Sequence, residues 1–216
     1  NDPNAQGRKK HAGDAIFEDV NNDGQLDSKD MKFMGYIRPD KVGGIVNSFK
    51  YKGLTVRVVM DWAMGHVIDN GFKGQIMGSS RNNNNAIKDA MTNSWQSAND
   101  GTKYPKYTVQ SDYDYQYRNH MRWDNQIGSS ESGSTNNSLY FSKGDYLAFR
   151  EVSLSYMLPS TWVRKIRLSG VEVFAGAYNI GYIKKYDGMF PEIYTGVDYG
   201  VYPRPRQYNM GVKINF

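Results

Sequence analysis

The C-terminal segment 206–216 alternates strictly between apolar and polar side chains. The apolar members are Tyr208, Met210, Val212, Ile214 and Phe216, and the residues between them are Asn209, Gly211, Lys213 and Asn215. Successive side chains of a β-strand point to opposite faces, so this pattern predicts a two-faced strand over 204–216. Such a strand needs neighbours that continue both faces, which commits the chain to a β-sheet.

Four earlier segments predict the neighbouring strands, at 42–51, 54–65, 144–157 and 167–178. Lys52-Gly53 joins the first two by a turn short enough to force an antiparallel hairpin. Leu158-Pro159 ends the third, because proline cannot donate a hydrogen bond to a ladder. The aromatic content of 14% and the 22 glycines favour strands joined by turns. We therefore predict an all-β fold with antiparallel strands.

The predicted connections alternate in length along the chain. Those at 52–53 and 158–166 are short, whereas those at 66–143 and 179–203 are long. All short turns then lie at one end of the sheet and all long loops at the other, as in bacterial outer-membrane barrels. No run of about 18 apolar residues occurs, which excludes a transmembrane helix but not a barrel. A soluble sandwich with few connections remains compatible with this pattern.

Composition argues against several other functions. The chain has no cysteine, which excludes disulfides and thiol catalysis. Its net charge is +5, but the basic residues are scattered, so we expect no nucleic-acid partner. Three histidines occur without any zinc-protease, serine-hydrolase or phosphate-loop motif, so we expect no enzyme. The chain begins without methionine or a signal peptide, and we expect it to be a fragment.

Segment 19–30, with the sequence DVNNDGQLDSKD, has the spacing of an EF-hand-type calcium loop. Such a loop has oxygen ligands at positions 1, 3, 5, 7, 9 and 12 and glycine at position 6. The predicted Ca²⁺ ligands are Asp19, Asn21, Asp23, Gln25 through its carbonyl, Asp27 through a water, and Asp30, with Gly24 in the turn. Aspartate at position 12 predicts a weak site, because its short side chain makes bidentate ligation harder. The alternative is an ion-free turn rich in Asn, Asp and Gly.

The long loop 66–143 contains low-complexity stretches at 81–85 and 128–138, with helical spacing of apolar residues over 86–95 between them. Its aromatic residues offer flat surfaces that could stack on sugar rings or peptide side chains. The candidates for substrate binding are Trp95, Tyr113, Tyr115 and Trp123. The alternative is that Tyr113, Tyr115 and Tyr117, which are spaced two residues apart, continue a barrel strand beyond the membrane and pack on neighbouring loops.

Motifs in the same order along nearly the whole chain resemble those of the SusC/RagA-type TonB-dependent outer-membrane transporters. They are GDAIFEDVNNDG, the hairpin from MGYIRPDKVGG onward, SWQSANDGTKYPKY, DYLAFREVSLSYMLP, YNIGYIKKYDGMFPEI and YPRPRQYNMGVKINF. The chain departs from the family at Gln96 and Ser97, which replace Thr and Pro, and at Phe190, where Asp is usual.

The resemblance implies import of glycan or peptide fragments across the outer membrane of a Gram-negative bacterium, energised through TonB, with a SusD-like surface lipoprotein as partner. The family barrel is of the plugged type with about 22 strands. This chain would supply its C-terminal strands, whereas the plug and the TonB-contacting segment would lie upstream. The segment ending at Phe216 would be the strand that barrel-assembly machinery recognises.

Counting the strands back from the C-terminus predicts the side of the membrane on which each loop lies. If Phe216 ends in the periplasm, 1–41 is an extracellular loop that carries the calcium site, and the long loops 66–143 and 179–203 of the barrel region 42–216 are extracellular too. The competing hypothesis is a secreted calcium-binding β-sandwich that binds carbohydrate. Such a module has no reason to end on an alternating strand, and the sequence does not name a substrate.

Overall fold

A computed structural model of the chain describes residues 12–14, 16, 18–24, 28–73, 79–80, 88–102, 104–109 and 138–216. It divides into two compact units. The loop unit comprises Asn1–Ile37, Val67–Ser142 and Ile193–Val201, and the sheet unit comprises Arg38–His66, Lys143–Glu192 and Tyr202–Phe216. Among the described residues, no helix combines the length and the apolar character needed to cross a membrane.

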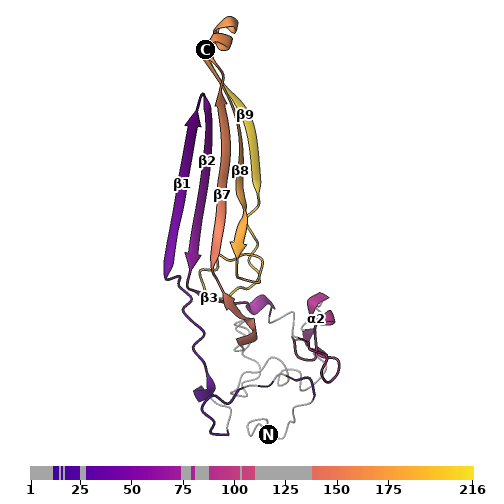
Figure 1. The fold of residues 1–216 in the computed structure, drawn as a ribbon. Helices are drawn as coiled ribbons and strands as arrows, with labels where there is room; N and C mark the ends of the chain where they lie inside the picture. Colours follow the sequence, from indigo (N-terminus) through magenta and orange to yellow (C-terminus); the bar gives the residue numbers. More distant parts are fainter. Residues whose placement is uncertain are drawn as a thin grey trace. The chain divides into compact units, whose positions relative to one another are not determined.

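The sheet unit is built on one five-stranded antiparallel sheet with its strands in chain order (Figure 1). The strands are β1 (Lys41–Tyr51), β2 (Leu54–Met64), β7 (Tyr146–Met157), β8 (Gly170–Lys184) and β9 (Gln207–Asn215). Each strand pairs with the next, so β1 and β9 form the two edges. The predicted all-β antiparallel fold is confirmed.

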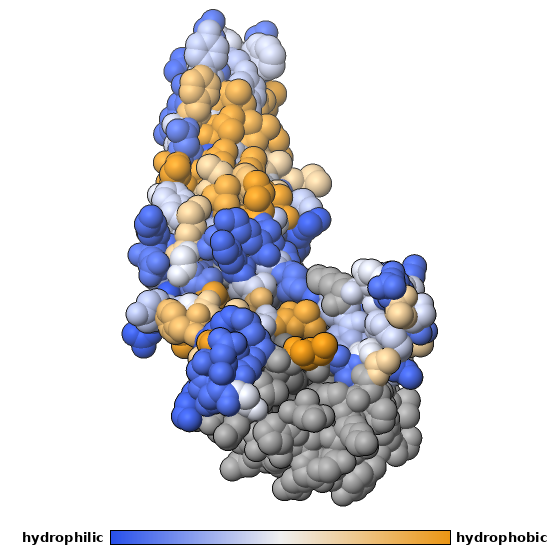
Figure 2. Space-filling model, turned by 60° about the horizontal axis from the view of Figure 1, so that its bottom comes forward, coloured by the Kyte–Doolittle hydropathy of each residue, from blue (hydrophilic) through white to orange (hydrophobic). Residues whose placement is uncertain are grey.

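The register sorts side chains into an apolar face and a polar face. One cross-strand row on the apolar face is Phe49, Val56, Leu154, Ala175 and Met210, and the adjacent row on the polar face is Ser48, Arg57, Ser153, Gly176 and Asn209. Phe49, Leu154 and Met210 are exposed although they are large and apolar. The view in Figure 2 shows a zone of apolar residues over the strands, bordered by more hydrophilic residues.

Strand β8 runs six residues past its predicted end at 178, so the predicted loop 179–203 is wrong at its start and the connection begins at 185. Asn179 and Gly181 both have positive φ, of 51° and 157°. Asn179 lies in a β-bulge and Gly181 borders it, because the register with β7 shifts between Phe149, which pairs with Gly181, and Glu151, which pairs with Tyr178. A bulge inserts an extra residue without ending the strand, which local turn signals cannot reveal.

The other strand ends lie within three residues of their predicted positions. The largest differences are at the starts of β8 and β9, which begin at Gly170 and Gln207 where 167 and 204 were predicted. The start of β9 follows two prolines, at 203 and 205. Proline cannot join a ladder through its nitrogen, so the pairing starts beyond them. Phe216 lies one residue past the end of β9.

The short connections meet at one end of the sheet, which we call the turn end. Lys52-Gly53 joins β1 to β2, while α4 (Ser160–Val163) and η5 (Arg164–Ile166) lie between β7 and β8. The Met157 N–H donates to the Gly53 carbonyl at 2.8 Å, and the Ser169 N–H donates to the Asn215 carbonyl at 2.8 Å. The opposite end, where β2, β7 and β8 reach Met64, Tyr146 and Lys184, is the loop end.

The loop unit contains short elements where one long loop, 66–143, was predicted. They are β3 (Val67–Asp69), β4 (Ser79–Ser80), α2 (Lys88–Thr92), β5 (Thr108–Val109), η4 (Ser138–Tyr140), β6 (Phe141–Lys143, whose last residue falls in the sheet unit) and, upstream, η2 (Ser28–Asp30). β3 pairs with β6, and β4 pairs with β5. Ala90, Tyr104 and Tyr140 form a small buried cluster. The predicted helix 86–95 corresponds to α2, which ends three residues early at Thr92; residues 86 and 87 lie outside the described residues.

Candidate functional site

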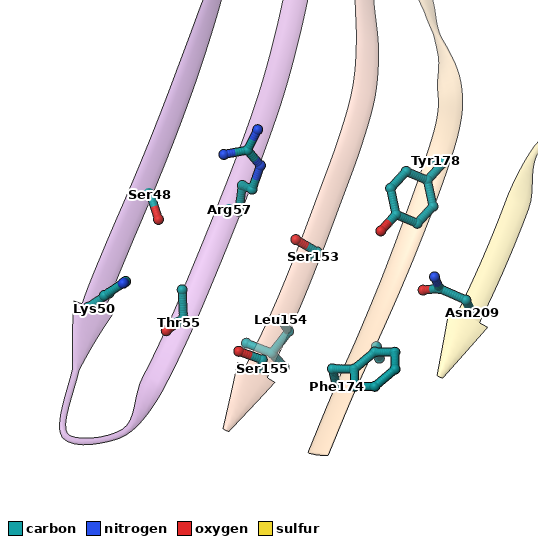
Figure 3. A pocket seen from close by; sticks show the side chains of 11 residues that line it. Ser48, Lys50, Thr55, Arg57, Ser153, Leu154, Ser155, Phe174, Tyr178 and Asn209 are labelled. Atoms are coloured by element: carbon teal, nitrogen blue, oxygen red, sulfur yellow. The ribbon is translucent and has the colours of Figure 1, made fainter. Parts of the chain in front are cut away.

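The polar face of the sheet carries a hollow of about 360 Å³ to which all five strands contribute (Figure 3). Its lining residues are Ser48, Lys50, Thr55, Arg57, Ser153, Leu154, Ser155, Phe174, Ala175, Tyr178 and Asn209. Gly211 leaves room for the Phe174 ring, because a Cβ added at this glycine would lie 2.7 Å from the ring. Hydroxyl and amide groups beside two aromatic rings can bind carboxylates, amides or sugar hydroxyls.

The two cations of the hollow differ in their surroundings. The Arg57 Nε lies 3.4 Å from a Glu151 carboxylate oxygen, and the other oxygen of Glu151 accepts a hydrogen bond from Ser153 Oγ at 2.7 Å. Lys50 has no ion-pair partner among the residues that the structure describes. The hollow therefore keeps one uncompensated positive charge that can attract an anionic group.

A denser polar network lies toward the loop end, around Arg150. Its Nε and Nη2 donate to the two carboxylate oxygens of Asp61 at 2.6 and 2.8 Å, a bidentate pair. Its Nη1 lies 2.6 Å from a carboxylate oxygen of Glu192. The guanidinium thus joins a residue of β2 to a residue that follows β8.

Glu192 is the most deeply buried member of this network, with a side chain only 1% exposed. The Tyr182 hydroxyl donates to it at 2.6 Å, and Arg204 pairs with it at 3.1 Å. The Tyr182 ring contacts Phe190 edge-on, with centroids 5.8 Å apart. Segment 185–192 is thereby fixed to the strands. Sequence reasoning missed this network because its members are far apart in the chain, although a charged residue within an apolar strand, as at Asp61, is a usable signal.

His66 and Asp145 lie at the rim of the loop end. Burial lowers the pKa of His66, and the nearby Asp145 carboxylate opposes that shift only in part. Asp145 accepts from the Gly65 N–H at 2.8 Å and from Lys185 at 3.0 Å, and the first of these bonds is the main reason why its pKa is lowered. The imidazole is held against Gly144, where a Cβ would lie 2.3 Å from Nε2. His66 therefore stays neutral at pH 7.

Four of the six predicted calcium ligands, Asp19, Asn21, Asp23 and Asp30, are described. The Gly24 N–H donates to Asp19 Oδ2 at 2.8 Å, with Gly24 at a φ of 80°. The Val20 N–H donates to Asp30 Oδ1 at 2.8 Å, which ties the two ends of the segment together. The turn thus folds back on itself as a calcium loop would.

The donor atoms of the loop are used in different ways. Asp23 accepts from the Asn21 side chain at 2.9 Å and lies 3.6 Å from Lys29 Nζ. Asp19 Oδ1 is buried and has no hydrogen-bond partner. Gln25 and Asp27 lie outside the described residues. Within the described part of the chain, no three or more His, Asp or Glu side chains are grouped to hold a metal ion.

The chain is similar to known membrane receptors. No family model matches it. It is 25% identical over 216 residues to the TonB-dependent receptor P3 of Formosa agariphila, covering 94% of this chain and 19% of that protein. It is 26% identical over 91 residues to the TonB-dependent receptor SusC of Bacteroides thetaiotaomicron, covering 42% of this chain and 9% of that one.

Solved structures agree in fold. The RagAB peptide transporter matches with a TM-score of 0.60 at 20% identity, covering 83% of this chain and 17% of that one. The RagAB peptide importer in its closed-closed state matches with a TM-score of 0.62 at 21% identity, covering 86% and 18%. The chain is similar in sequence to SusC-type TonB-dependent receptors and in fold to RagA-type transporters. It spans only about a fifth of the length of the receptors that it matches over most of its own length.

The predicted assembly strand of this SusC/RagA relative is an edge strand. Tyr208 pairs with Ala177, Met210 with Ala175, and Val212 with Val173, so β9 continues the apolar face. Met210 and Phe216 are 88% and 93% exposed. Because β9 pairs on one side only, its other side can accept a further strand.

Of the four predicted substrate-binding aromatics, the structure describes Trp95 only, and Tyr113, Tyr115 and Trp123 lie outside the described residues. Trp95 is half-buried, and a Cβ at Gly13 would lie 2.3 Å from its ring. The backbone N–H of Trp95 donates to the Tyr104 carbonyl at 3.0 Å. Part of the ring is thus covered by the chain itself.

Proposed function

We propose that this chain forms the C-terminal wall of a TonB-dependent transporter that imports glycan or peptide fragments across a Gram-negative outer membrane. The observation that carries the proposal is the open sheet with one exposed apolar face and one polar face. In a membrane barrel, lipid covers the outer face, while water or a plug contacts the inner one. The relatives named TonB-dependent receptors support the same conclusion.

A secreted carbohydrate-binding β-sandwich is the weaker candidate. A sandwich buries the apolar face of one sheet against a second sheet about 10 Å away. Apart from the main sheet, the described residues contain ladders of only two strands. Two-stranded ladders have too little surface to cover a five-stranded face, whereas lipid covers it completely.

We place the hollow around Lys50 and Arg57 on the inner wall of the barrel, where it would face the substrate path or the plug. Its hydroxyls, aromatic rings and uncompensated cation suit both sugar hydroxyls and peptide carboxylates. RagAB is a peptide transporter, whereas the name of the TonB-dependent receptor SusC gives no substrate, so both substrate classes stay in the proposal. The expected partners are the remaining barrel, its plug, TonB and a SusD-like lipoprotein.

A matched pair of substitutions tests the membrane orientation. Val58 belongs to the apolar face and Val59 to the polar face of the same strand. Val58→Arg puts a charge into lipid, which costs about 2–4 kcal/mol near the midplane. We expect it to reduce the folded protein in detergent-extracted outer membrane, whereas Val59→Arg should leave the amount unchanged. Equal losses, or a wild-type protein in the soluble secreted fraction, would contradict the barrel.

Uptake tests the transport activity itself. Cells that express the full-length protein should take up labelled oligosaccharides or peptides only when TonB is present. Uptake that persists in a strain without TonB would contradict the energised mechanism, even if the protein were in the outer membrane. The two labelled substrates are compared in parallel, because the sequence does not decide between them.

We further propose that Ca²⁺ binds segment 19–30 outside the cell. Its support is Asp19 Oδ1, a buried oxygen without a hydrogen-bond partner, in a segment whose two ends are tied by the bond from the Val20 N–H to Asp30. When bound, the ion would cross-link the turn through oxygen ligands. We expect the double variant Asp19→Ala and Asp23→Ala to lower the calcium content of the purified protein, whereas Asp100→Ala, at an exposed turn elsewhere, should not. Unchanged calcium in the double variant would contradict the site.

A further inference from the structure

The helical turn between β7 and β8 exposes two of its apolar side chains. Val163 is buried, at 2% exposure, and anchors the turn to the sheet unit. Trp162 and Ile166, four residues apart, are 63% and 65% exposed. Trp162 lies in α4 and Ile166 ends η5, so the two exposed apolar side chains come from one short helical segment. The turn therefore presents a small apolar surface that the sheet unit does not cover.

Positive charge surrounds this surface. Arg164, Lys165 and Arg167 are exposed and have no ion-pair partner among the residues that the structure describes. Segment 152–171 contains no Asp or Glu at all. The adjoining hairpin adds Lys52, whose turn is hydrogen-bonded to Met157. Tryptophan, isoleucine and several cations on one short turn form an amphipathic surface.

The turn is located where the apolar face of the sheet ends. Tyr51, Leu54, Tyr156 and Val173 form the last apolar row before it. Tyr51 and Tyr156 are both exposed. Tyrosine and tryptophan are enriched where a membrane meets water, because their rings are amphipathic. Trp162 and Ile166 follow this row, at the level where lipid headgroups would begin.

We propose that the segment 158–169, the anchor turn, binds the headgroup layer of the outer membrane and prefers anionic phospholipids. Trp162 and Ile166 insert between the headgroups, and Arg164, Lys165 and Arg167 pair with lipid phosphates. The inference rests on the proposed function, since lipid must cover the adjoining apolar face. A lipid surface matches these observations because it offers apolar and anionic groups side by side.

The test is the depth of a nitroxide label in the full-length protein, reconstituted in nanodiscs. The chain has no cysteine, so Ile166→Cys, Thr161→Cys and Val152→Cys each give one labelled position within it. Collisions with oxygen and with a water-soluble nickel complex report lipid and water exposure. We expect the label at 166 to be reached by oxygen and protected from nickel, and the label at 161 to be open to nickel.

Changing the charge of the lipid tests whether the anchor turn prefers anionic headgroups or only inserts into the membrane. Adding phosphatidylglycerol to phosphatidylethanolamine nanodiscs should increase the protection of the label at 166 from nickel. The triple variant Arg164→Gln, Lys165→Gln and Arg167→Gln should lose that increase. The control variant Arg38→Gln and Lys41→Gln, at the loop end, should keep it. An increase that survives in the triple variant overturns the phosphate contacts.

The label at Val152, on the apolar face, separates this inference from the proposed function. If it is in lipid while the label at 166 is open to nickel, the anchor turn is wrong and the barrel stands. If the label at 152 is itself open to nickel, the barrel and the anchor turn fail together. Protection of the label at 166 from both oxygen and nickel would mean that protein covers the turn, which also overturns the proposal.

Discussion

The two ends of the sheet differ in whether their positive charges are paired with carboxylates inside the protein. At the loop end, Arg150 is neutralised inside the protein by Asp61 and Glu192. At the turn end, Arg164 and Lys165 have no internal partner among the described residues. Long connections can fold back and bring counter-charges to the strands, whereas short turns cannot. Charges at the turn end are therefore left exposed to solvent or to a charged surface.

The largest effect should come from removing the central cation of the loop end. Arg150→Met leaves the Asp61 and Glu192 carboxylates without their shared partner. We expect a loss of about 3 kcal/mol, the lower end for breaking a buried pair, because Arg204 still faces Glu192. Thermal unfolding of the purified full-length protein in detergent measures it.

Arg57→Met is the matched control, since the Arg57 side chain is 46% exposed and its pair with Glu151 is longer, at 3.4 Å. We expect a loss of less than about 1 kcal/mol, as for exposed ion pairs. Equal losses in the two variants would mean that the internal neutralisation at the loop end does not distinguish it from the rest of the polar face.

The next effect concerns packing at the rim of the loop end. Gly144→Ala adds a methyl group 2.3 Å from the His66 ring. We expect a loss of about 1–3 kcal/mol, because overpacking forces neighbouring groups to shift. A double-mutant cycle with His66→Ala should recover part of the loss. Strictly additive losses would show that the two residues are not in contact.

Acid should weaken the loop end in two steps. Burial lowers the pKa of His66 below its ordinary value of 6.5, so the unfolded chain binds a proton more readily, and stability falls as the pH drops below 6.5. The lowered pKa of Asp145 gives stability that is present above pH 3.8 and is lost as the pH falls through its folded value. Thermal unfolding against pH should show both steps, and His66→Gln should remove only the upper one.

The smallest effects compare single lysines at the two ends. Lys185→Gln removes a 3.0 Å pair with Asp145, and we expect a loss of about 0.2–1 kcal/mol in thermal unfolding. Lys165→Gln removes no internal pair, so its unfolding in detergent should stay within about 0.5 kcal/mol of wild type. A larger loss for Lys165→Gln would reveal an internal partner and would weaken the contrast between the ends.

The sequence predicted a strand correctly wherever each face of that strand stays apolar or polar along its whole length. The alternation of Tyr208, Met210 and Val212 persists because one face of β9 is apolar along its whole length. The same reasoning ended β8 at 178, six residues before its end at Lys184, although Asn179 and Gly181 continue the strand with positive φ. Whether such residues end a strand or form a bulge depends on the neighbouring strand, which the local sequence does not contain.

The candidate sites likewise differ in whether their residues are close together in the sequence. The spacing from Asp19 to Asp30 is local, so the sequence could propose a calcium loop, which stays a prediction. The hollow and the Arg150 network join residues of strands that are distant in the chain. Their grouping depends on register, and a shift of one residue would turn each side chain to the other face.

By itself, the sequence determined that this protein is an antiparallel sheet with one apolar and one polar face, and its motifs identified the relatives. Both properties follow from side-chain order along the chain, which period-2 geometry converts directly into faces. Only the tertiary structure decided that Glu192 is buried beside Arg150 while Trp162 stays exposed. That difference arises because burial is decided by which distant segments meet, and a strand pattern does not specify those contacts.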